Sequence, residues 1–169
     1  MSSGMRDAAP PRARLARTAV AAGDGPPPDG PGGVLLEGRN LGKVFKAGGE
    51  ELAILRGLDL SIGPGHSVAI LGASGSGKST LMYLLGGLDR PSSGSVVSGG
   101  RDVFSLPEPE LARWRAREVG FVFQFHYLLS DFTALETVAM PALLEGRGRK
   151  DALALAEPLL ERVGLRDRR

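Results

Sequence analysis

One segment of the 169-residue chain combines glycine, lysine and hydroxyl side chains at a spacing that suits phosphate chemistry. It reads Gly72-Ala73-Ser74-Gly75-Ser76-Gly77-Lys78-Ser79, which matches the pattern G-x-x-x-x-G-K-[ST], and Thr80 follows. The glycines allow successive backbone N–H groups to turn inward around a phosphate, at the positive end of the next helix. Lys78 would reach the β- and γ-phosphates, and the Ser79 hydroxyl would be a ligand of Mg²⁺. The pattern predicts a binding site for a nucleoside triphosphate.

Such a loop works only between a strand and a helix, and the flanking residues predict both. Residues 67–71 form a short continuous apolar run, which is typical of a strand buried on both faces of a sheet. Leu81, Leu84, Leu85 and Leu88 recur at the spacing of a core-facing helix. The alternative interpretation, a flexible Gly/Ser turn that carries a lysine by chance, does not account for this context.

The rest of the chain alternates strand and helix patterns, which predicts an α/β fold. Hydrophobic runs or alternation predict strands at 34–36, 44–45, 58–62, 95–97 and 121–124, with Phe121 and Phe123 packed in the core. Two capping-box patterns, Ser105 with Glu108 and Thr133 with Glu136, predict helix starts.

Proline and glycine predict where the later helices stop. The helix after Thr133 should kink or end at Pro141, because proline lacks the N–H that the helix needs. The last helix is expected from about Lys150 to Val163-Gly164, where glycine takes its usual C-terminal position. Pro158 inside that helix has no explanation in the sequence pattern.

Composition limits the classes of function. The 42% hydrophobic and 24% charged residues are typical of a globular domain, and no apolar run reaches the length of a membrane span. There is no cysteine, and His66 and His126 are too few for a histidine metal site. The net charge of +2, with arginines scattered along the chain, does not favour nucleic acid as a partner. We expect a soluble intracellular chain.

Residues 1–32 differ from the rest because proline, glycine and arginine dominate there. Such a segment buries too little apolar surface to offset the entropy of ordering, so we expect a disordered leader. A basic arm for membrane or RNA is the alternative, but Asp7, Asp24 and Asp29 largely cancel the arginines. Translation could also start at Met5.

Two classes of phosphate-loop protein can be weighed from single residues. A guanine-specific GTPase would carry an Asn-Lys-x-Asp motif, but the only asparagine is Asn40, and Leu41 follows it. A nucleotide kinase would use arginines beyond the loop to bind a second substrate. Arg113, Arg115 and Arg117 could serve, but we favour the simpler explanation that they form the solvated face of the helix that carries Trp114.

Three features resemble the ATP-binding subunits of ATP-binding-cassette (ABC) transporters. They are the phosphate loop with its continuation through residues 81–94, the aromatic Phe45 upstream, and the run Phe121-Val122-Phe123-Gln124-Phe125-His126-Tyr127-Leu128-Leu129. Within that family, residues 124–141 are especially similar to the ATPases of lipoprotein-releasing systems and of macrolide-exporter-like machines. The resemblance covers about residues 34–169.

The resemblance implies a fold and a set of roles. The fold would be the phosphate-loop NTPase core of an ABC nucleotide-binding domain, with an N-terminal β-subdomain and the start of a helical subdomain. ATP and Mg²⁺ would bind at residues 72–80, with Phe45 stacked on adenine. Gln124 would contact Mg²⁺ or the attacking water and act in catalysis together with Lys78. The alternative for Gln124 is an ordinary polar residue at a strand end.

The same resemblance implies partners and a location. The segment from Phe125 to Pro141 would face an integral-membrane transporter subunit, with His126 as a partner-surface or packing residue. In the complete protein, two ATPase subunits would form a head-to-tail homodimer. The protein would be cytoplasmic, on the inner face of a bacterial inner membrane.

Other parts of an ABC ATPase are not found in these residues. No apolar strand after the loop ends in the Asp and Glu needed for hydrolysis, and the signature motif and switch histidine are missing. We expect residues 33–169 to be a partial ABC domain that binds ATP through Lys78 without turnover.

The expected function of the complete protein is ATP hydrolysis that powers lipoprotein release or related export. The alternatives are a small phosphate-loop kinase and a non-hydrolysing ATP-binding regulator that docks on a membrane partner. A kinase would transfer phosphate to a second substrate, and its ATP affinity would be unchanged by Phe45→Ala.

Overall fold

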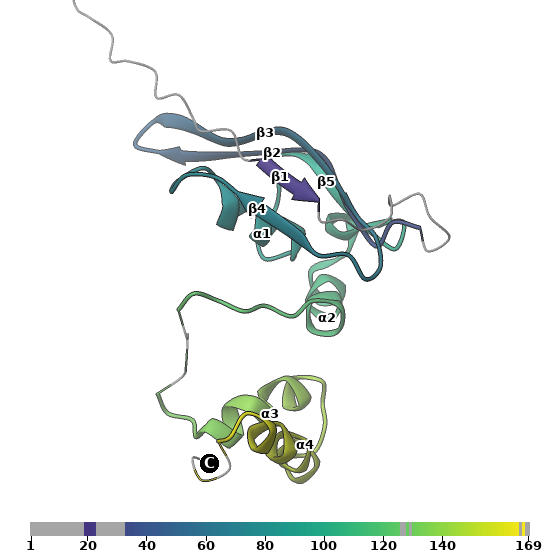
Figure 1. The fold of residues 1–169 in the computed structure, drawn as a ribbon, viewed down its shortest axis with the longest axis vertical. Helices are drawn as coiled ribbons and strands as arrows, with labels where there is room; N and C mark the ends of the chain where they lie inside the picture. Colours follow the sequence, from purple (N-terminus) through teal and green to yellow (C-terminus); the bar gives the residue numbers. More distant parts are fainter. Residues whose placement is uncertain (1–18, 23–32, 126–127, 129, 166, 168–169) are drawn as a thin grey trace, which may run out of the picture. The chain divides into compact units, whose positions relative to one another are not determined.

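The computed structural model describes residues 19–22, 33–125, 128, 130–165 and 167. It divides into two compact units, Met1–Leu111 and Ala112–Arg169, and each is described here by itself. The first unit holds the strands, the phosphate loop and helix α1, whereas the second holds helices α3 and α4 (Figure 1). The α/β class expected from the sequence is confirmed.

A long antiparallel hairpin of β2 (Leu36–Ala47) and β3 (Glu50–Ile62) dominates the first unit (Figure 1). β5 (Ser93–Ser98) and β6 (Arg101–Asp102) extend it into a four-stranded sheet of order β3-β2-β5-β6. The strands predicted at 44–45, 58–62 and 95–97 all lie in this sheet. They form because alternating apolar residues cover one face of a half-buried sheet.

The pairing of β2 with β3 has three register shifts, and the one between Lys43 and Val44 is a bulge. Lys43 pairs with Leu55 and Val44 pairs with Ala53, which leaves Ile54 as an extra residue on β3. A bulge of this kind turns consecutive side chains out of strict alternation and increases the local twist. Ile54 and Leu55 therefore can both face the same neighbour.

Helix α1 (Lys78–Leu85) packs its apolar face into the first unit's core. Leu81, Leu84 and Leu85 are buried, as the spacing predicted. Leu88 is 47% exposed, so its place in the predicted stripe is wrong. The helix stops before it, because Gly86 and Gly87 end the helical conformation, with Gly87 at a φ of +70°.

Strand β4 (Val68–Leu71) leads into the phosphate loop and pairs antiparallel with β1 (Ala19–Ala22) (Figure 1). The expectation that β4 is buried on both faces is wrong, since Leu71 is 60% exposed. In the described part of the chain β4 belongs to a sheet of only two strands, which leaves alternate residues open to solvent.

β1 also corrects the expected disorder of residues 1–32 at four positions. Pairing with β4 satisfies backbone N–H and C=O groups of both strands, and residues 18–22 contain no proline, glycine or charge to prevent it. The remainder of that segment lies outside the described residues.

The 3₁₀ turn η1 (Val103–Ser105) precedes helix α2 (Glu108–Glu118). The predicted capping box of Ser105 with Glu108 is wrong, because α2 begins only at Glu108 and Ser105 lies in the preceding 3₁₀ turn, where its hydroxyl donates to the carbonyl of Asp102 at 2.7 Å. The helix begins after Pro107, whose carbonyl accepts from the N–H groups of Glu110 and Leu111. Proline suits the start of a helix because its fixed φ is already helical.

Residues 121–124 form no strand, contrary to the sequence prediction. This segment belongs to neither sheet, so its backbone lacks the neighbouring strand that the prediction required. Phe121 and Phe123 stack on each other instead of entering a core, with ring centroids 5.3 Å apart. Val122 and Phe123 are exposed.

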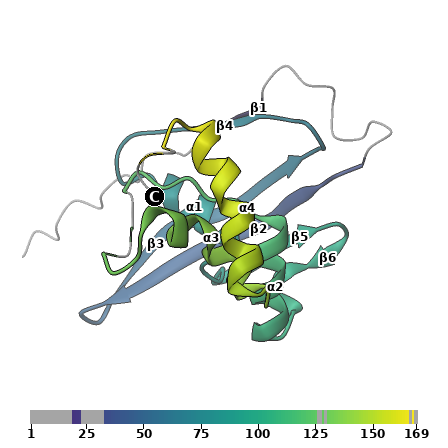
Figure 2. The ribbon, with the colours of Figure 1, turned by 90° about the horizontal axis from the view of Figure 1, so that it is seen from below.

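The second unit is a hairpin of α3 (Ala134–Leu144) and α4 (Arg149–Arg162), which pack against each other (Figure 2). Its core consists of small residues, Ala139, Ala152 and Ala156, surrounded by partly buried apolar side chains. The Thr133–Glu136 capping box is confirmed.

Proline does not end either helix of this hairpin. α3 continues through Pro141 to Leu144, so of the predicted kink or end the structure excludes the end, and α4 contains Pro158. α4 finishes just before Val163 and Gly164, as expected, with Gly164 at a φ of +74°. Among the described residues, every helix is too short or too polar to cross a bilayer.

Candidate functional site

The loop between β4 and α1 is closed by its own lysine. Lys78 is the first residue of α1, and its Nζ donates to the carbonyl oxygens of Gly72 at 2.9 Å and Ala73 at 2.7 Å. The N–H of Ser76 donates to Ala73 O at 3.2 Å. An ammonium group has three N–H donors. Two of them hold the loop, and the third remains for a ligand.

The start of α1 is suited to an anion. Its N-cap, Gly77, has no side chain to cap the helix, and the first turn contains no acidic residue. The first N–H groups of a helix lack intrahelical acceptors and carry the positive end of the helix dipole. Ser79 and Thr80 follow Lys78 in this first turn, and Ser79 is exposed.

Two glycines show how the loop is packed. A Cβ on Gly77, at a φ of +92°, would lie 2.8 Å from Ile54 Cγ2 and 3.1 Å from Leu55 Cδ2. The bulge in β3 thus presses two consecutive apolar side chains against the loop. A Cβ on Gly75, at a φ of +77°, would meet nothing within 4 Å. The loop is packed on the hairpin at Gly77 and open at Gly75.

These observations fit a triphosphate with a magnesium ion. The loop offers a lysine ammonium, an uncapped helix start and an exposed hydroxyl, and open space lies next to Gly75. Mg²⁺ on such a loop takes phosphate oxygens, waters and one hydroxyl as ligands. Within the described ranges, no group of three or more His, Cys, Asp or Glu side chains could hold a metal ion.

Phe45 lies on the hairpin that contacts the loop. It pairs with Leu52 in the β2–β3 register, and its side chain is 42% exposed. The Nζ of Lys43 lies 5.0 Å from the centroid of its ring. The structure thus brings Phe45 and the phosphate loop into one unit. Adenine stacking by Phe45 stays a prediction.

Gln124 lies in the other unit, in a bend, with its side chain exposed. Since the two units are described separately, its predicted role at the phosphate loop stays a prediction. Phe125 and Leu128 are exposed as well, whereas His126, Tyr127 and Leu129 lie outside the described residues.

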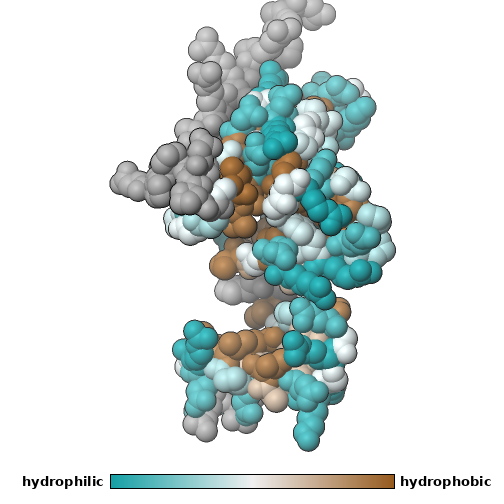
Figure 3. Space-filling view, turned by 90° about the vertical axis from the view of Figure 1, so that its right-hand side faces the viewer, coloured by the Kyte–Doolittle hydropathy of each residue, from teal (hydrophilic) through white to brown (hydrophobic). Residues whose placement is uncertain are grey.

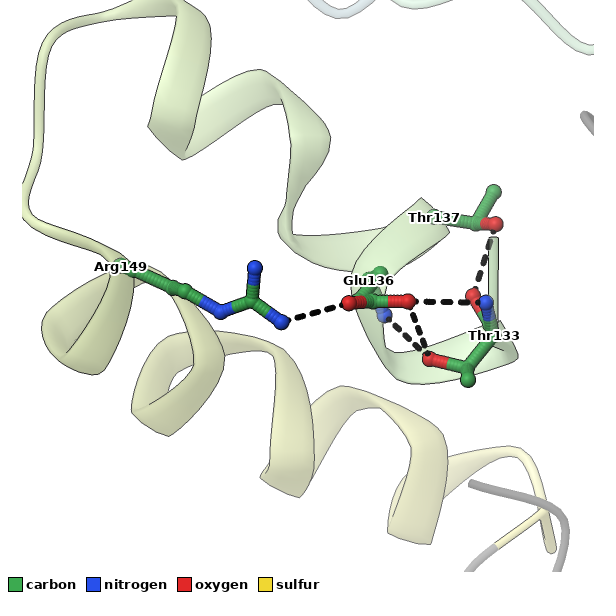
Figure 4. Close-up of polar contacts among 4 residues, drawn as sticks. All are labelled: Thr133, Glu136, Thr137 and Arg149. Carbon is green, nitrogen blue, oxygen red and sulfur yellow. Dashed lines mark hydrogen bonds and ion pairs between the residues drawn. The ribbon is translucent and has the colours of Figure 1, made fainter. Parts of the chain in front are cut away.

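A polar network fixes the start of α3 (Figure 4). The Thr133 N–H donates to Glu136 Oε2 at 3.1 Å, and the Glu136 N–H donates to Thr133 Oγ1 at 3.2 Å. Arg149, at the start of α4, donates to Glu136 Oε1 at 2.7 Å. The hydrogen bond from the Thr133 backbone, the Thr133 hydroxyl and Arg149 together lower the pKa of Glu136. The network holds the two helix starts together.

Apolar side chains also gather on the surface of the helical hairpin (Figure 3). The exposed large ones along α3, α4 and the following turn are Leu144, Leu155, Leu159 and Val163. Together with the exposed Phe125, Leu128 and Phe132, they give the second unit the apolar surface that is typical of an interface.

Sequence reasoning missed the buried Lys43. Its Nζ donates to Asp89 Oδ1 at 2.6 Å and to the carbonyl of Arg90 at 2.7 Å. The available signal was a lysine two positions before Phe45, directly before the strand predicted at 44–45. A charge at such a position needs a partner, but the sequence pattern does not identify it.

Comparisons with known proteins match the chain over most of its length. The sequence profile of the family described as "ABC transporter" matches residues 55–169, which include the phosphate loop and Gln124. The lipoprotein-releasing system ATP-binding protein LolD of Syntrophus aciditrophicus is 53% identical over 79% of this chain and 60% of its own length. LolD of Geobacter metallireducens is 51% identical over 79% of this chain and 60% of its own length.

Solved structures are similar in fold. The dimeric structure of a post-hydrolysis state of an ATP-binding cassette bound to ADP and Pi matches with a TM-score of 0.65 at 31% identity, and covers 75% of this chain and 56% of that one. A dimeric bacterial ABC transporter cassette matches with a TM-score of 0.60 at 30% identity, and covers 71% of this chain and 53% of that one. The chain spans about 60% of the length of the curated relatives it matches.

Proposed function

The chain belongs to the ABC transporter family and has part of the fold of its ATP-binding cassette, and from this premise we propose that residues 72–80 bind ATP with Mg²⁺. The observation that carries the proposal is the loop itself. Its lysine is anchored on two loop carbonyls, and the helix start beside it has neither a side-chain cap nor an acidic residue. An ABC ATP-binding domain implies nucleotide binding, and this loop offers the donors for it.

Each residue has a separate part in the proposed complex. Backbone N–H groups from Gly75 to Thr80 and the Lys78 ammonium bind the phosphates, while Ser79 is a magnesium ligand. Gln124 is proposed as a second magnesium or water contact with a catalytic role. Phe45 stacks on adenine, which fits its exposed ring on the hairpin beside the loop.

For the whole protein we propose ATP hydrolysis that drives lipoprotein release or related export. The similarity to LolD proteins, at about half of the residues, supports this substrate class. The dimeric cassettes among the similar structures support a homodimer of ATPase subunits. The exposed apolar residues between Phe125 and Pro141 support contact with a membrane subunit, on the inner face of a bacterial inner membrane.

The first test is ATP binding, measured by titration calorimetry on the 169-residue chain with Mg²⁺. Lys78→Ala removes a charged hydrogen-bond donor worth about 1.5–3 kcal/mol, so ATP binding should weaken about 10- to 150-fold. Lys46→Ala removes the same charge from an exposed position on β2 and should leave the Kd unchanged. Equal affinity of Lys78→Ala and the wild type would overturn the proposal.

A second titration separates the adenine from the phosphate end. Phe45→Ala should weaken ATP about 5- to 150-fold, from a stacking energy of about 1–3 kcal/mol, and leave inorganic tripolyphosphate unaffected. Leu52→Ala is the matched control, because Leu52 is the register partner of Phe45 and is also exposed. No change with Phe45→Ala would instead support the kinase alternative.

A further inference from the structure

One buried ammonium group links the two ends of the proposed nucleotide site. The side chain of Lys43 is only 11% exposed, and its Nζ contacts three groups. It donates to Asp89 Oδ1 at 2.6 Å and to Arg90 O at 2.7 Å, and it lies 5.0 Å from the ring centroid of Phe45. The first two contacts join segments 46 and 47 residues apart in sequence.

Burying a lysine is unfavourable unless its charge is paired and hydrogen-bonded. Here the carboxylate and the carbonyl provide that pairing, and they fix the ammonium at one point. The remaining side of the ammonium faces the negative face of an aromatic ring, which is a favourable cation–π contact. The anchored ammonium group of Lys43 therefore holds the Phe45 ring, although that ring is partly exposed to solvent.

The anchor itself is tied to the helix that carries the phosphate loop. Asp89 follows α1, and the N–H groups of Leu88 and Asp89 donate to Tyr83 O, at 2.8 and 3.2 Å. Tyr83 belongs to α1, which starts at Lys78. A continuous path of contacts runs from the loop through α1 and Asp89 to Lys43, and from there to Phe45.

We propose that Lys43 is a positioning residue that holds the Phe45 ring for stacking on the nucleotide base. This inference rests on the proposed function of the loop and of Phe45. Without the cation, the ring loses the contact that orients it on the strand, so stacking on the base weakens. The phosphate loop keeps its own hydrogen bonds, so binding of the phosphates alone is unchanged.

The test is Lys43→Met, which keeps an unbranched side chain and removes the charge. Calorimetry with ATP and with inorganic tripolyphosphate, both with Mg²⁺, separates base from phosphate. We expect ATP to bind about 2- to 30-fold more weakly, the range of a cation–π contact, with tripolyphosphate unchanged. Lys46→Met is the matched control. It lies on the same strand with an 80% exposed side chain, and its ATP affinity should equal the wild type's.

A double-mutant cycle with Phe45→Ala shows whether Lys43 acts through the ring. In the Phe45→Ala background, Lys43→Met should cause no further loss of ATP affinity. A further loss of ATP affinity from Lys43→Met in the Phe45→Ala background would overturn the inference. So would an equal loss of affinity for ATP and tripolyphosphate in Lys43→Met alone, or no loss of ATP affinity in that variant. Wild-type chain that bound neither ligand would instead refute the proposed function.

Asp89→Ala provides a second route if circular dichroism shows that Lys43→Met does not fold. It keeps the lysine but removes the carboxylate that anchors it. We expect weaker ATP binding with unchanged tripolyphosphate binding. The wild-type affinity for ATP in this variant would overturn the inference, because the ring would then not need the anchored cation.

Discussion

Replacing Gly77 by alanine should damage the phosphate loop in two separable ways. At a φ of +92° a residue with a Cβ is strained, and the new methyl group would also meet Ile54 Cγ2 at 2.8 Å and Leu55 Cδ2 at 3.1 Å. Positive φ costs an L-residue about 1–2 kcal/mol. Overpacking against a filled neighbourhood adds about 1–3 kcal/mol. The variant should therefore lose about 2–5 kcal/mol of unfolding free energy.

Gly75→Ala is the matched control for the strain alone. Gly75 has a φ of +77°, but its Cβ would meet nothing within 4 Å. Both substitutions reduce the entropy of the unfolded chain by the same amount, so that contribution cancels between them. The difference between the two variants, about 1–3 kcal/mol, isolates the contact with the β3 bulge.

The assay is urea unfolding followed by circular dichroism, with linear extrapolation to water. Ile54→Ala in the Gly77→Ala background removes the nearest clashing atom, so the double variant should be more stable than the sum of the single effects. Equal destabilisation by Gly77→Ala and Gly75→Ala, together with additive effects of Gly77→Ala and Ile54→Ala, would refute the reasoning.

Three further predictions concern the helical hairpin and use the same urea assay. The pKa of Glu136 lies below its ordinary 4.5, chiefly because of the hydrogen bond from the Thr133 backbone. The ionised side chain therefore stabilises the fold fully above pH 4.5, and this stabilisation is lost as the pH falls through the lowered pKa. The wild type should lose stability below pH 4.5 more steeply than Glu136→Gln, and parallel curves of stability against pH would contradict this. Thr133→Ala removes the cap and should cost about 1 kcal/mol, whereas Thr133→Ser should retain most of it. Leu160→Ala should lower the free energy of unfolding by about 2–5 kcal/mol, because its side chain is buried. Leu159→Ala changes an exposed neighbour and should alter it by no more than about 0.5 kcal/mol. A larger loss for Leu159→Ala than for Leu160→Ala would show that the other face of α4 is packed.

Features set by neighbouring residues could be predicted from the sequence. The helix after the loop and the capping box at Thr133 and Glu136 both depend on residues a few positions apart. Their backbone geometry is fixed by local hydrogen bonds and by glycine. The phosphate loop was the clearest case, because each glycine and the lysine have a local role.

Features that depend on distant partners could not be predicted in the same way. Residues 121–124 have the apolar, β-branched and aromatic residues of a strand, yet neither sheet includes them. β4 is more exposed than its apolar run indicated, since exposure depends on how many strands pair with it. The pair of Lys43 and Asp89 requires the register of β2 against the end of α1, which no local pattern reveals.

The bulge at Ile54 has a consequence for how the chain folds. Because side chains alternate along a strand, a one-residue slip of β3 against β2 would turn Ile54 and Leu55 away from Gly77. A hairpin that pairs in the wrong register would therefore leave the loop without its packing surface. During refolding, ATP affinity would therefore recover when the hairpin reaches its correct register rather than when the chain collapses. ATP binding would measure the fraction of chains with the correct register.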